Sequence, residues 1–311
     1  MHGRLSNRKG ILLCCVLLVV ALSSSCLSNS ARSETQQSGC PPNVSSCWSA
    51  TRLEVLSRSG QVRRNLNLPS GFYTNPAWSP DGGSIAVLAK EGLVVVDLAT
   101  LDVKVLEPVG PLTILSHPTW SPDGGSIAFA QSSDSSGSGP PAPDHIKVVD
   151  VHTKKTRDLG EGFQPSWSPQ GQWIAINASG QIWLIRPDGS GRHALGVRGF
   201  TTSWSPDGKT IAYDDLADGR DGIFIIDSAG GKEATLRAPG AMPAWSPSGD
   251  QIAYLSGTFL DMTIMRADGA DPTLFSRLPV DSFSWSPTGA SLVVAVIVGQ
   301  SFAPTPPPQN E

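Results

Sequence analysis

The sequence predicts an all-β fold, a six-bladed β-propeller built from four-stranded antiparallel blades. The tripeptide Trp-Ser-Pro occurs six times, at intervals of 42, 47, 37, 41 and 40 residues, and a period near 40 is typical of propeller blades. A second strand pair follows each of the first five copies. The 311 residues also include 32 glycines and 26 prolines, which excludes a bundle of long helices because both residues disfavour helix interiors.

A hairpin is expected around each Trp-Ser-Pro. The six copies read Asn75-PAWSPDGGSIAV, His117-PTWSPDGGSIAF, Gln164-PSWSPQGQWIAI, Thr201-TSWSPDGKTIAY, Met242-PAWSPSGDQIAY and Ser282-FSWSPTGASLVV. Proline fixes φ in the turn, and the glycine two residues later supplies a left-handed residue, which glycine adopts without steric cost. Positive φ is therefore predicted at Gly82, Gly124, Gly171, Gly208, Gly249 and Gly289.

The last blade is expected to be completed by the N-terminal strands. Second strand pairs begin at Leu93, Ile146, Ile182, Ile223 and Met262, whereas the sixth copy runs into a Pro-rich tail. The segment Leu53-EVLSRSGQVRRNLNL has the missing strand–turn–strand pattern, and adding it to the sixth copy would close the ring. The predicted domain boundaries are 1–25 for a signal peptide, 26–51 for a linker, 52–300 for the propeller and 301–311 for a disordered tail.

The repeated tryptophans are expected to be structural. They are Trp78, Trp120, Trp167, Trp204, Trp245 and Trp285. At a fixed place beside each turn, a large ring can fill the wedge between neighbouring blades, which explains the repetition better than six ligand-stacking residues. Trp173 and Trp183 occupy alternating strand positions of the third blade, and we expect them to pack as well.

The first 26 residues are typical of an export signal. Arg4, Arg8 and Lys9 precede an apolar run from Ile11 to Leu22, which suits a signal peptide and is shorter than the about 20 residues of a transmembrane helix. The following Ala21-Leu22-Ser23-Ser24-Ser25-Cys26 resembles the lipobox of bacterial lipoproteins, which implies lipid attachment at Cys26. Ordinary cleavage after the serines is the alternative. Either way, we expect an extracytoplasmic protein.

Charge and cysteine usage agree with export. Without residues 1–25, 20 basic and 27 acidic residues remain. Such a chain has no electrostatic basis for binding nucleic acid, since that affinity rests on phosphate neutralisation. In an oxidising compartment, Cys40 and Cys47 can form a disulfide that closes an eight-residue loop in the linker. Two free thiols are the alternative.

The P-x-W-S-P-D-G-x-x-I-A unit resembles the repeat of TolB-like β-propellers, over roughly residues 52–299. The resemblance implies the fold but not the role of TolB, in which an α/β domain precedes the propeller; residues 27–51 are too few for one. Prolyl oligopeptidases and oligogalacturonate lyases have similar blades. Their hydrolase domain and His-rich metal site are not expected here, because no Gly-x-Ser-x-Gly occurs and the histidines do not pair at ligand spacing. Those histidines are His117, His145, His152 and His193. No cofactor or metal is therefore predicted.

Three weaker features have structural explanations. The Asp-rich segment 214–222 offers carboxylates to Ca²⁺ but lacks EF-hand spacing, so a solvated loop is preferred. The Ser-, Gly- and Pro-rich residues 131–144 read as a surface loop, either a tolerated insertion or a partner contact. The aspartates of three turns are replaced in the sister blades, so they are expected to shape turns rather than bind ligands. These aspartates are Asp81, Asp123 and Asp207, and their replacements are Gln170, Ser248 and Thr288.

A non-catalytic binding or scaffold function is predicted. Propellers surround one mouth with loops from every blade, and the residues just before each inner strand are expected to line it: Asn75, His117, Gln164, Thr201, Met242 and Ser282. Apolar contacts are expected from Phe72, Tyr73, Phe163 and Phe200. The expected partner is a protein or peptide, or else a glycan, of the cell envelope, bound by a monomer held at the membrane only by its lipid. The alternative is a carbohydrate-active lyase or hydrolase, which would need convergent carboxylates or histidines at the mouth.

Overall fold

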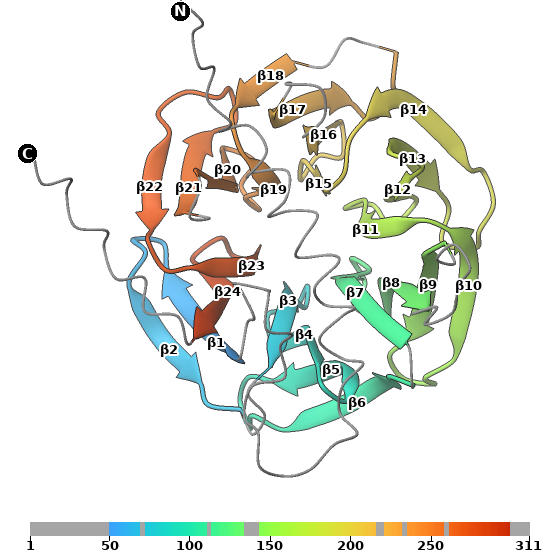
Figure 1. The fold of residues 1–311 in the computed structure, drawn as a ribbon, viewed down its shortest axis with the longest axis vertical. Helices are drawn as coiled ribbons and strands as arrows, with labels where there is room; N and C mark the ends of the chain where they lie inside the picture. The colour runs from blue at the N-terminus through green and yellow to red at the C-terminus, as the bar shows by residue number, and fades with distance from the viewer. Residues whose placement is uncertain are drawn as a thin grey trace, which may run out of the picture.

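The protein is a six-bladed propeller. The structure, a computed structural model, describes residues 50–68, 72–110, 113–133, 143–215, 221–231, 235–257 and 261–298. These residues form 24 strands in six four-stranded antiparallel sheets. Figure 1 shows the sheets arranged as blades around one axis, with the first strand of each blade nearest the axis and the fourth at the rim. The predicted fold class is confirmed.

The strands follow the repeat closely. The first blade contains β3 (Tyr73–Trp78), β4 (Ser84–Ala89), β5 (Gly92–Asp97) and β6 (Val103–Pro108). The second contains β7 (Thr113–Trp120), β8 (Ser126–Ser133), β9 (His145–Asp150) and β10 (Thr156–Glu161). The third contains β11 (Phe163–Trp167), β12 (Ile174–Ala178), β13 (Gln181–Ile185) and β14 (His193–Arg198).

The other three blades repeat this order. The fourth contains β15 (Thr202–Trp204), β16 (Thr210–Asp215), β17 (Gly222–Asp227) and β18 (Thr235–Ala238). The fifth contains β19 (Ala241–Trp245), β20 (Gln251–Ser256), β21 (Asp261–Arg266) and β22 (Thr273–Ser276). The sixth contains β23 (Val280–Trp285) and β24 (Ser291–Val298), completed by β1 (Ala50–Ser57) and β2 (Val62–Leu66).

The two ends of the described chain close the ring. β1 pairs with β24 in one unbroken antiparallel register from Ala50 opposite Val298 to Ser57 opposite Ser291. The sheet order is β2-β1-β24-β23, so the N-terminal pair supplies the two outer strands of the sixth blade, as predicted. The closure joins opposite ends of the described chain by backbone hydrogen bonds within the sixth blade, and the chain then continues from β2 to β3 in the first blade.

The turn after each motif tryptophan has the predicted backbone. All six turn glycines are left-handed, with φ between 68° and 77°, where a Cβ is disfavoured. In the fourth blade, Ser205 Oγ donates to Asp207 Oδ1 at 2.7 Å, and Lys209 N donates to the same oxygen at 3.1 Å. Both bonds lie within one turn, so this aspartate shapes the turn.

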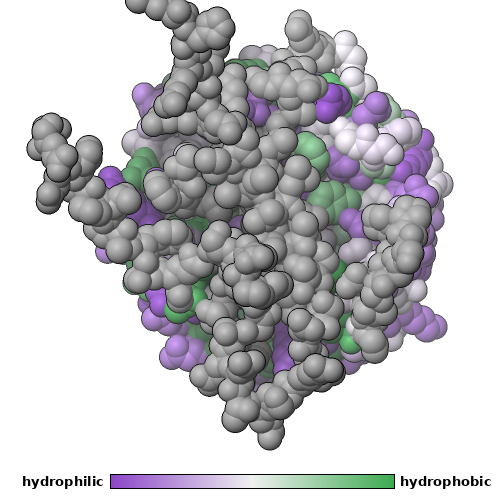
Figure 2. Space-filling view, in the orientation of Figure 1, coloured by the Kyte–Doolittle hydropathy of each residue, from purple (hydrophilic) through white to green (hydrophobic). Residues whose placement is uncertain are grey.

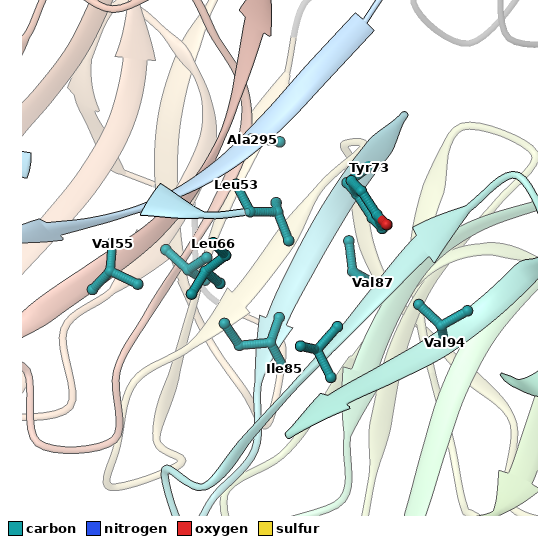
Figure 3. Packing of buried hydrophobic residues seen from close by; sticks show 10 residues of the cluster. Leu53, Val55, Leu66, Tyr73, Ile85, Val87, Val94 and Ala295 are labelled. Atoms are coloured by element: carbon teal, nitrogen blue, oxygen red, sulfur yellow. The ribbon is translucent and has the colours of Figure 1, made fainter. Parts of the chain in front are cut away.

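The core consists of six separate apolar clusters, one between each pair of neighbouring blades. Figure 3 shows the cluster between the sixth and first blades, where Leu53 and Leu66 face Ile85 and Val87. Each cluster contains or contacts one motif tryptophan. The blades therefore adhere mainly by apolar burial, and the tryptophans lie at the predicted position.

The indole N–H groups of these tryptophans alternate around the ring. In the second, fourth and sixth blades, the indole donates to a backbone carbonyl of the preceding blade. The pairs are Trp120 to Ala77 at 3.0 Å, Trp204 to Ser166 at 3.0 Å and Trp285 to Ala244 at 3.1 Å. Trp78 donates within its own hairpin, to Gly82 at 3.1 Å, and the buried Nε1 atoms of Trp167 and Trp245 have no partner.

Several predicted features lie outside the described residues. They are the signal peptide, the lipidation site Cys26, the Cys40–Cys47 pair, the tail 301–311 and residues 134–142 of the predicted insertion. Across the ranges that the structure does describe, no helix is long and apolar enough to cross a membrane.

Candidate functional site

The six predicted mouth residues form one ring at equivalent positions of the innermost strands, which we call the inner ring. It consists of Asn75, His117, Gln164, Thr201, Met242 and Ser282. The prediction placed them before the inner strands, but only Thr201 precedes its strand, and the other five lie inside theirs. The strands extend further because they continue past a bulge that the repeat pattern does not reveal.

Four inner-ring residues have left-handed backbones although they are not glycine. The φ angles are 51° at Asn75, 51° at His117, 50° at Gln164 and 55° at Met242, and a proline follows each of them. The strand register shifts at the same places. Such a backbone costs about 1–3 kcal/mol per residue, so neighbouring contacts must hold it. Its effect is to turn each residue out of the regular pleat toward the adjoining blade.

Hydrogen bonds link the inner-ring residues of adjacent blades. Asn75 N donates to Ser282 Oγ at 2.8 Å, which joins the first blade to the sixth. His117 N donates to Asn75 Oδ1 at 3.4 Å, which joins the second to the first. The Nε2 atoms of Gln164 and His117 are 3.3 Å apart, across the third and second blades. These side chains therefore help to hold the ring together in addition to any binding role.

In the fourth blade, the buried carboxylate of Asp214 links neighbouring blades by hydrogen bonds. Asp214 is 1% exposed and accepts hydrogen bonds from Met242 N at 2.8 Å, Thr201 N at 2.8 Å and Thr201 Oγ1 at 2.6 Å. Burial raises the pKa of Asp214, and these hydrogen bonds oppose the rise. The prediction of a solvated loop is therefore wrong for Asp214 and for Asp215, which is 3% exposed. Residues 216–220 lie outside the described chain.

His117 and Gln164 leave two buried polar atoms without partners. Desolvation lowers the pKa of His117 to about 4, so its imidazole is neutral at physiological pH. If the Gln164 amide donates to Nε2, the proton is on Nδ1, which then lacks an acceptor, and Gln164 Oε1 lacks a donor. The reverse amide orientation exchanges the two roles. Either arrangement leaves one donor and one acceptor free at this part of the ring.

The predicted apolar contacts are only partly present. Phe163 meets the His117 ring edge-on, with centroids 5.4 Å apart, and Phe72 is 38% exposed. Tyr73 instead belongs to the core between the sixth and first blades. Three of the histidines weighed above as possible metal ligands lie in strands: His117, His145 and His193.

The inner ring offers hydrogen-bonding groups rather than a set of metal ligands. Among the described residues, no three His, Cys, Asp or Glu side chains gather closely enough to hold a metal ion. Two carboxylates contact the ring through hydrogen bonds. Both oxygens of Asp214 are occupied, and Asp281 Oδ2 accepts from Ser282 Oγ at 2.8 Å and from Thr74 Oγ1 at 2.5 Å. Chemically, the ring is suited to recognising uncharged polar groups.

Comparisons with known proteins show the fold. No protein-family model matches the chain, and no curated protein does either. Among solved structures, a "putative TolB" from Agrobacterium tumefaciens matches with a TM-score of 0.68 and 19% identity, over 81% of this chain and 99% of that one. An oligogalacturonate lyase in complex with manganese matches with a TM-score of 0.55 and 15% identity, over 76% and 80%. A nidogen/laminin complex matches with a TM-score of 0.55 and 12% identity, over 72% and 92%. The chain thus has a TolB-like propeller fold.

Proposed function

We propose that this protein is an exported, lipid-anchored propeller that binds a protein or peptide of the cell envelope at its inner ring, without catalysis. The basic n-region, the apolar run and Cys26 support export and lipid attachment. The similarity to a "putative TolB" supports the propeller architecture, but fold alone does not fix a ligand. The chemistry of the ring therefore carries the proposal.

The observation that carries it is the group of buried polar atoms without partners on three consecutive inner strands. They are His117 Nδ1 in the second blade, Gln164 Oε1 in the third and Thr202 Oγ1 in the fourth. Buried polar atoms in folded proteins are nearly always hydrogen-bonded, so a group of exceptions on adjacent strands calls for an explanation such as a bound water, an ion or a functional role. Backbone amides or side-chain carboxamides of a partner provide both donors and acceptors for such atoms.

The lyase or hydrolase alternative has less support at the ring. Acid–base chemistry needs a titratable group that can reach the substrate and exchange protons near the working pH. Asp214 is buried and fully hydrogen-bonded, and the low pKa of His117 makes it a weak base. Asp281 is the partly exposed carboxylate beside the ring, and its Oδ2 is held by hydrogen bonds from Ser282 and Thr74. The manganese named with one lyase structure belongs to that protein.

The binding proposal is tested by quantitative capture from the native envelope. The full chain serves as bait beside Asn75→Asp, which keeps the acceptor for His117 N but places a charge in the ring. The matched control is Asn65→Asp, the same change at an exposed position of outer strand β2. A partner retained by the control and lost by Asn75→Asp supports the proposal. Equal retention by both variants contradicts it.

The anchoring proposal has its own test. Cys26→Ala is expected to leave the protein exported but free in the soluble extracytoplasmic fraction, because the lipid-bearing thiol is gone. The measurement is membrane fractionation together with the mass of the mature N-terminus. A soluble wild type with an unmodified N-terminus would show that the export signal is of the ordinary cleaved type.

A further inference from the structure

The third blade departs from the repeat at Trp173, just before its second strand, β12. At the start of the second strand, five blades have small or polar residues: Ser84, Ser126, Thr210, Gln251 and Ser291. The third blade has Trp173 at that place. Residues that recur in every blade serve the common fold, so the fold does not require a tryptophan here. The residues in contact with Trp173 indicate its role.

Two arginines of the third blade lie over tryptophan rings. The guanidinium carbon of Arg186 is 5.2 Å from the centre of the Trp173 ring, and that of Arg192 is 5.3 Å from the centre of the Trp183 ring. His193 meets Trp173 edge-on at 5.0 Å. A cation over an indole is held in a defined orientation, so both guanidinium groups are fixed although both residues are exposed.

Glycine at position 191 makes the first of these stacks possible. A Cβ at Gly191 would come within 3.2 Å of Arg186 Nε and within 3.3 Å of the Trp173 ring. Its φ of 68° is also left-handed. The turn thus packs closely against the stacked pair and limits the movement of the arginine.

Neither guanidinium has a hydrogen-bond or ion-pair partner among the described residues. In the fifth blade, Arg266 at the corresponding turn forms an ion pair with Asp268 at 3.3 Å. In both blades the turn aspartate accepts from the backbone two residues on, Ser190 N to Asp188 at 2.9 Å and Ala270 N to Asp268 at 3.0 Å. Asp188 forms no ion pair with Arg186: the Ser190 hydrogen bonds lower the pKa of Asp188 most, and Arg186 adds to this only through space. Planar guanidinium groups with free N–H donors are suited to bidentate binding of carboxylates.

The two arginines lie on opposite faces of the blade. Trp173 packs on the cluster shared with the fourth blade, and Trp183 packs on the cluster shared with the second. Between them lies β14, the outermost strand, which pairs with β13 on one side. Successive side chains of a strand point to opposite faces of a sheet. A peptide added beside β14 would therefore direct neighbouring residues toward Arg186 and Arg192 in turn.

The local charge also fits an acidic partner. Residues 163–198 contain three arginines and one acid, Asp188, whereas the whole chain has 23 basic and 27 acidic residues. Figure 2 shows that the right-hand edge of the molecule, where β14 lies in Figure 1, is largely hydrophilic. The sixth blade is also basic, but there Arg64 donates to Leu98 O at 2.8 Å and Arg58 pairs with Asp250 at 3.6 Å.

We propose that the outer edge of the third blade binds an extended acidic peptide, which adds as a fifth strand beside residues 193–195. Two adjacent acidic residues of the peptide bind Arg186 and Arg192, one on each face of the sheet. β14 pairs only with β13 among the described strands, and this open edge favours a peptide over an acidic glycan, because a peptide can pair with its main-chain groups. This surface is separate from the inner ring, so the two proposals can fail independently.

The test is fluorescence anisotropy with labelled hexaglutamate and the full chain. The double variant Arg186→Gln, Arg192→Gln is expected to bind at least about tenfold more weakly, because two charge-assisted contacts are lost. The control Arg63→Gln, Arg64→Gln removes the same charge from the outer strand of the sixth blade and is expected to change binding by less than about twofold. Asn75→Asp in the inner ring is expected to have no effect.

Two further probes test the geometry. A peptide that alternates Glu with Thr places its carboxylates on one face only and is expected to bind more weakly than hexaglutamate. A galacturonate hexamer has the same number of carboxylates but no peptide backbone, and it is also expected to bind more weakly. Equal losses in both double variants, equal binding of the galacturonate, or no binding of hexaglutamate by the wild type would each overturn the proposal. Melting curves of all variants establish that they are folded.

Discussion

The alternation of indole hydrogen bonds leads to a sharp prediction about two equivalent tryptophans. Trp204 Nε1 donates to Ser166 O of the preceding blade at 3.0 Å, whereas the buried Trp245 Nε1 has no partner. Phenylalanine at either place keeps an aromatic ring and removes the N–H. We therefore expect Trp204→Phe to destabilise the protein clearly and Trp245→Phe to have little effect.

The magnitudes follow from two contributions. Each change removes apolar surface on the order of 40 Å², which costs about 1 kcal/mol at about 25 cal/mol per Å². At position 204, the carbonyl also loses its donor, which adds about 1–3 kcal/mol. At position 245, the substitution also removes the cost of a buried donor without an acceptor, and this gain offsets the loss of apolar burial. The expected losses are about 2–4 kcal/mol for Trp204→Phe and under about 1 kcal/mol for Trp245→Phe.

The assay is urea unfolding followed by far-ultraviolet circular dichroism, since tryptophan fluorescence changes with the substitutions themselves. The two variants are compared at equal m-values, so that the midpoints report stability. Equal losses would show that the indole hydrogen bonds contribute nothing beyond packing. A larger loss for Trp245→Phe would contradict the alternation itself.

Three other predictions concern charge, turns and closure. The pKa of His117 is about 4 in the folded protein and 6.5 ordinarily, so the unfolded state binds the proton first as pH falls. Between pH 7 and pH 4, the free energy of unfolding of the wild type should therefore fall by about 3 kcal/mol more than that of His117→Gln. The exposed His152→Gln serves as the control. Gly208→Val should cost more than about 1 kcal/mol of stability, because φ is 70° at this position. Asp207→Ser should cost under about 0.5 kcal/mol, since a serine fills that place in the fifth blade. Urea midpoints that rank Asp207→Ser as the more damaging change would refute the account of the turn. Deleting residues 51–68 removes nearly all of β1 and all of β2, which are two of the four strands of the closing sheet, and should abolish soluble folding. A truncated protein with an unchanged melting temperature would refute the closure.

The sequence predicted the features that depend on local chemistry repeated in every blade. A proline and a glycine at fixed distances from each tryptophan are enough to predict the hairpins, and one missing half-unit is enough to predict that β1 and β2 complete the sixth blade. These inferences needed no knowledge of distant contacts, because the same short pattern occurs six times in one chain.

The features that depend on neighbouring blades were not predictable. A residue before proline normally avoids helical backbone, so nothing local indicates the left-handed conformation of Asn75 or Gln164. Asp214 looked like part of an acidic loop because one of its hydrogen-bond donors, Met242 N, is 28 residues away in the next blade. Tyr73 was expected near the mouth, but it packs against the strands that close the ring. Each of these contacts appears only after the blades are placed side by side.

The most direct test of the inner ring as a binding site is site-specific photo-crosslinking in the native envelope. Phe72 is exposed and immediately precedes inner strand β3, whereas Leu274 is similarly exposed on outer strand β22. A benzophenone-bearing phenylalanine replaces each residue in turn, and the adducts are compared after illumination. We predict an adduct of one defined mass at position 72, absent at position 274 and lost when Asn75→Asp is added. An adduct at position 274 with none at position 72 would contradict the claim that the partner binds at the inner ring.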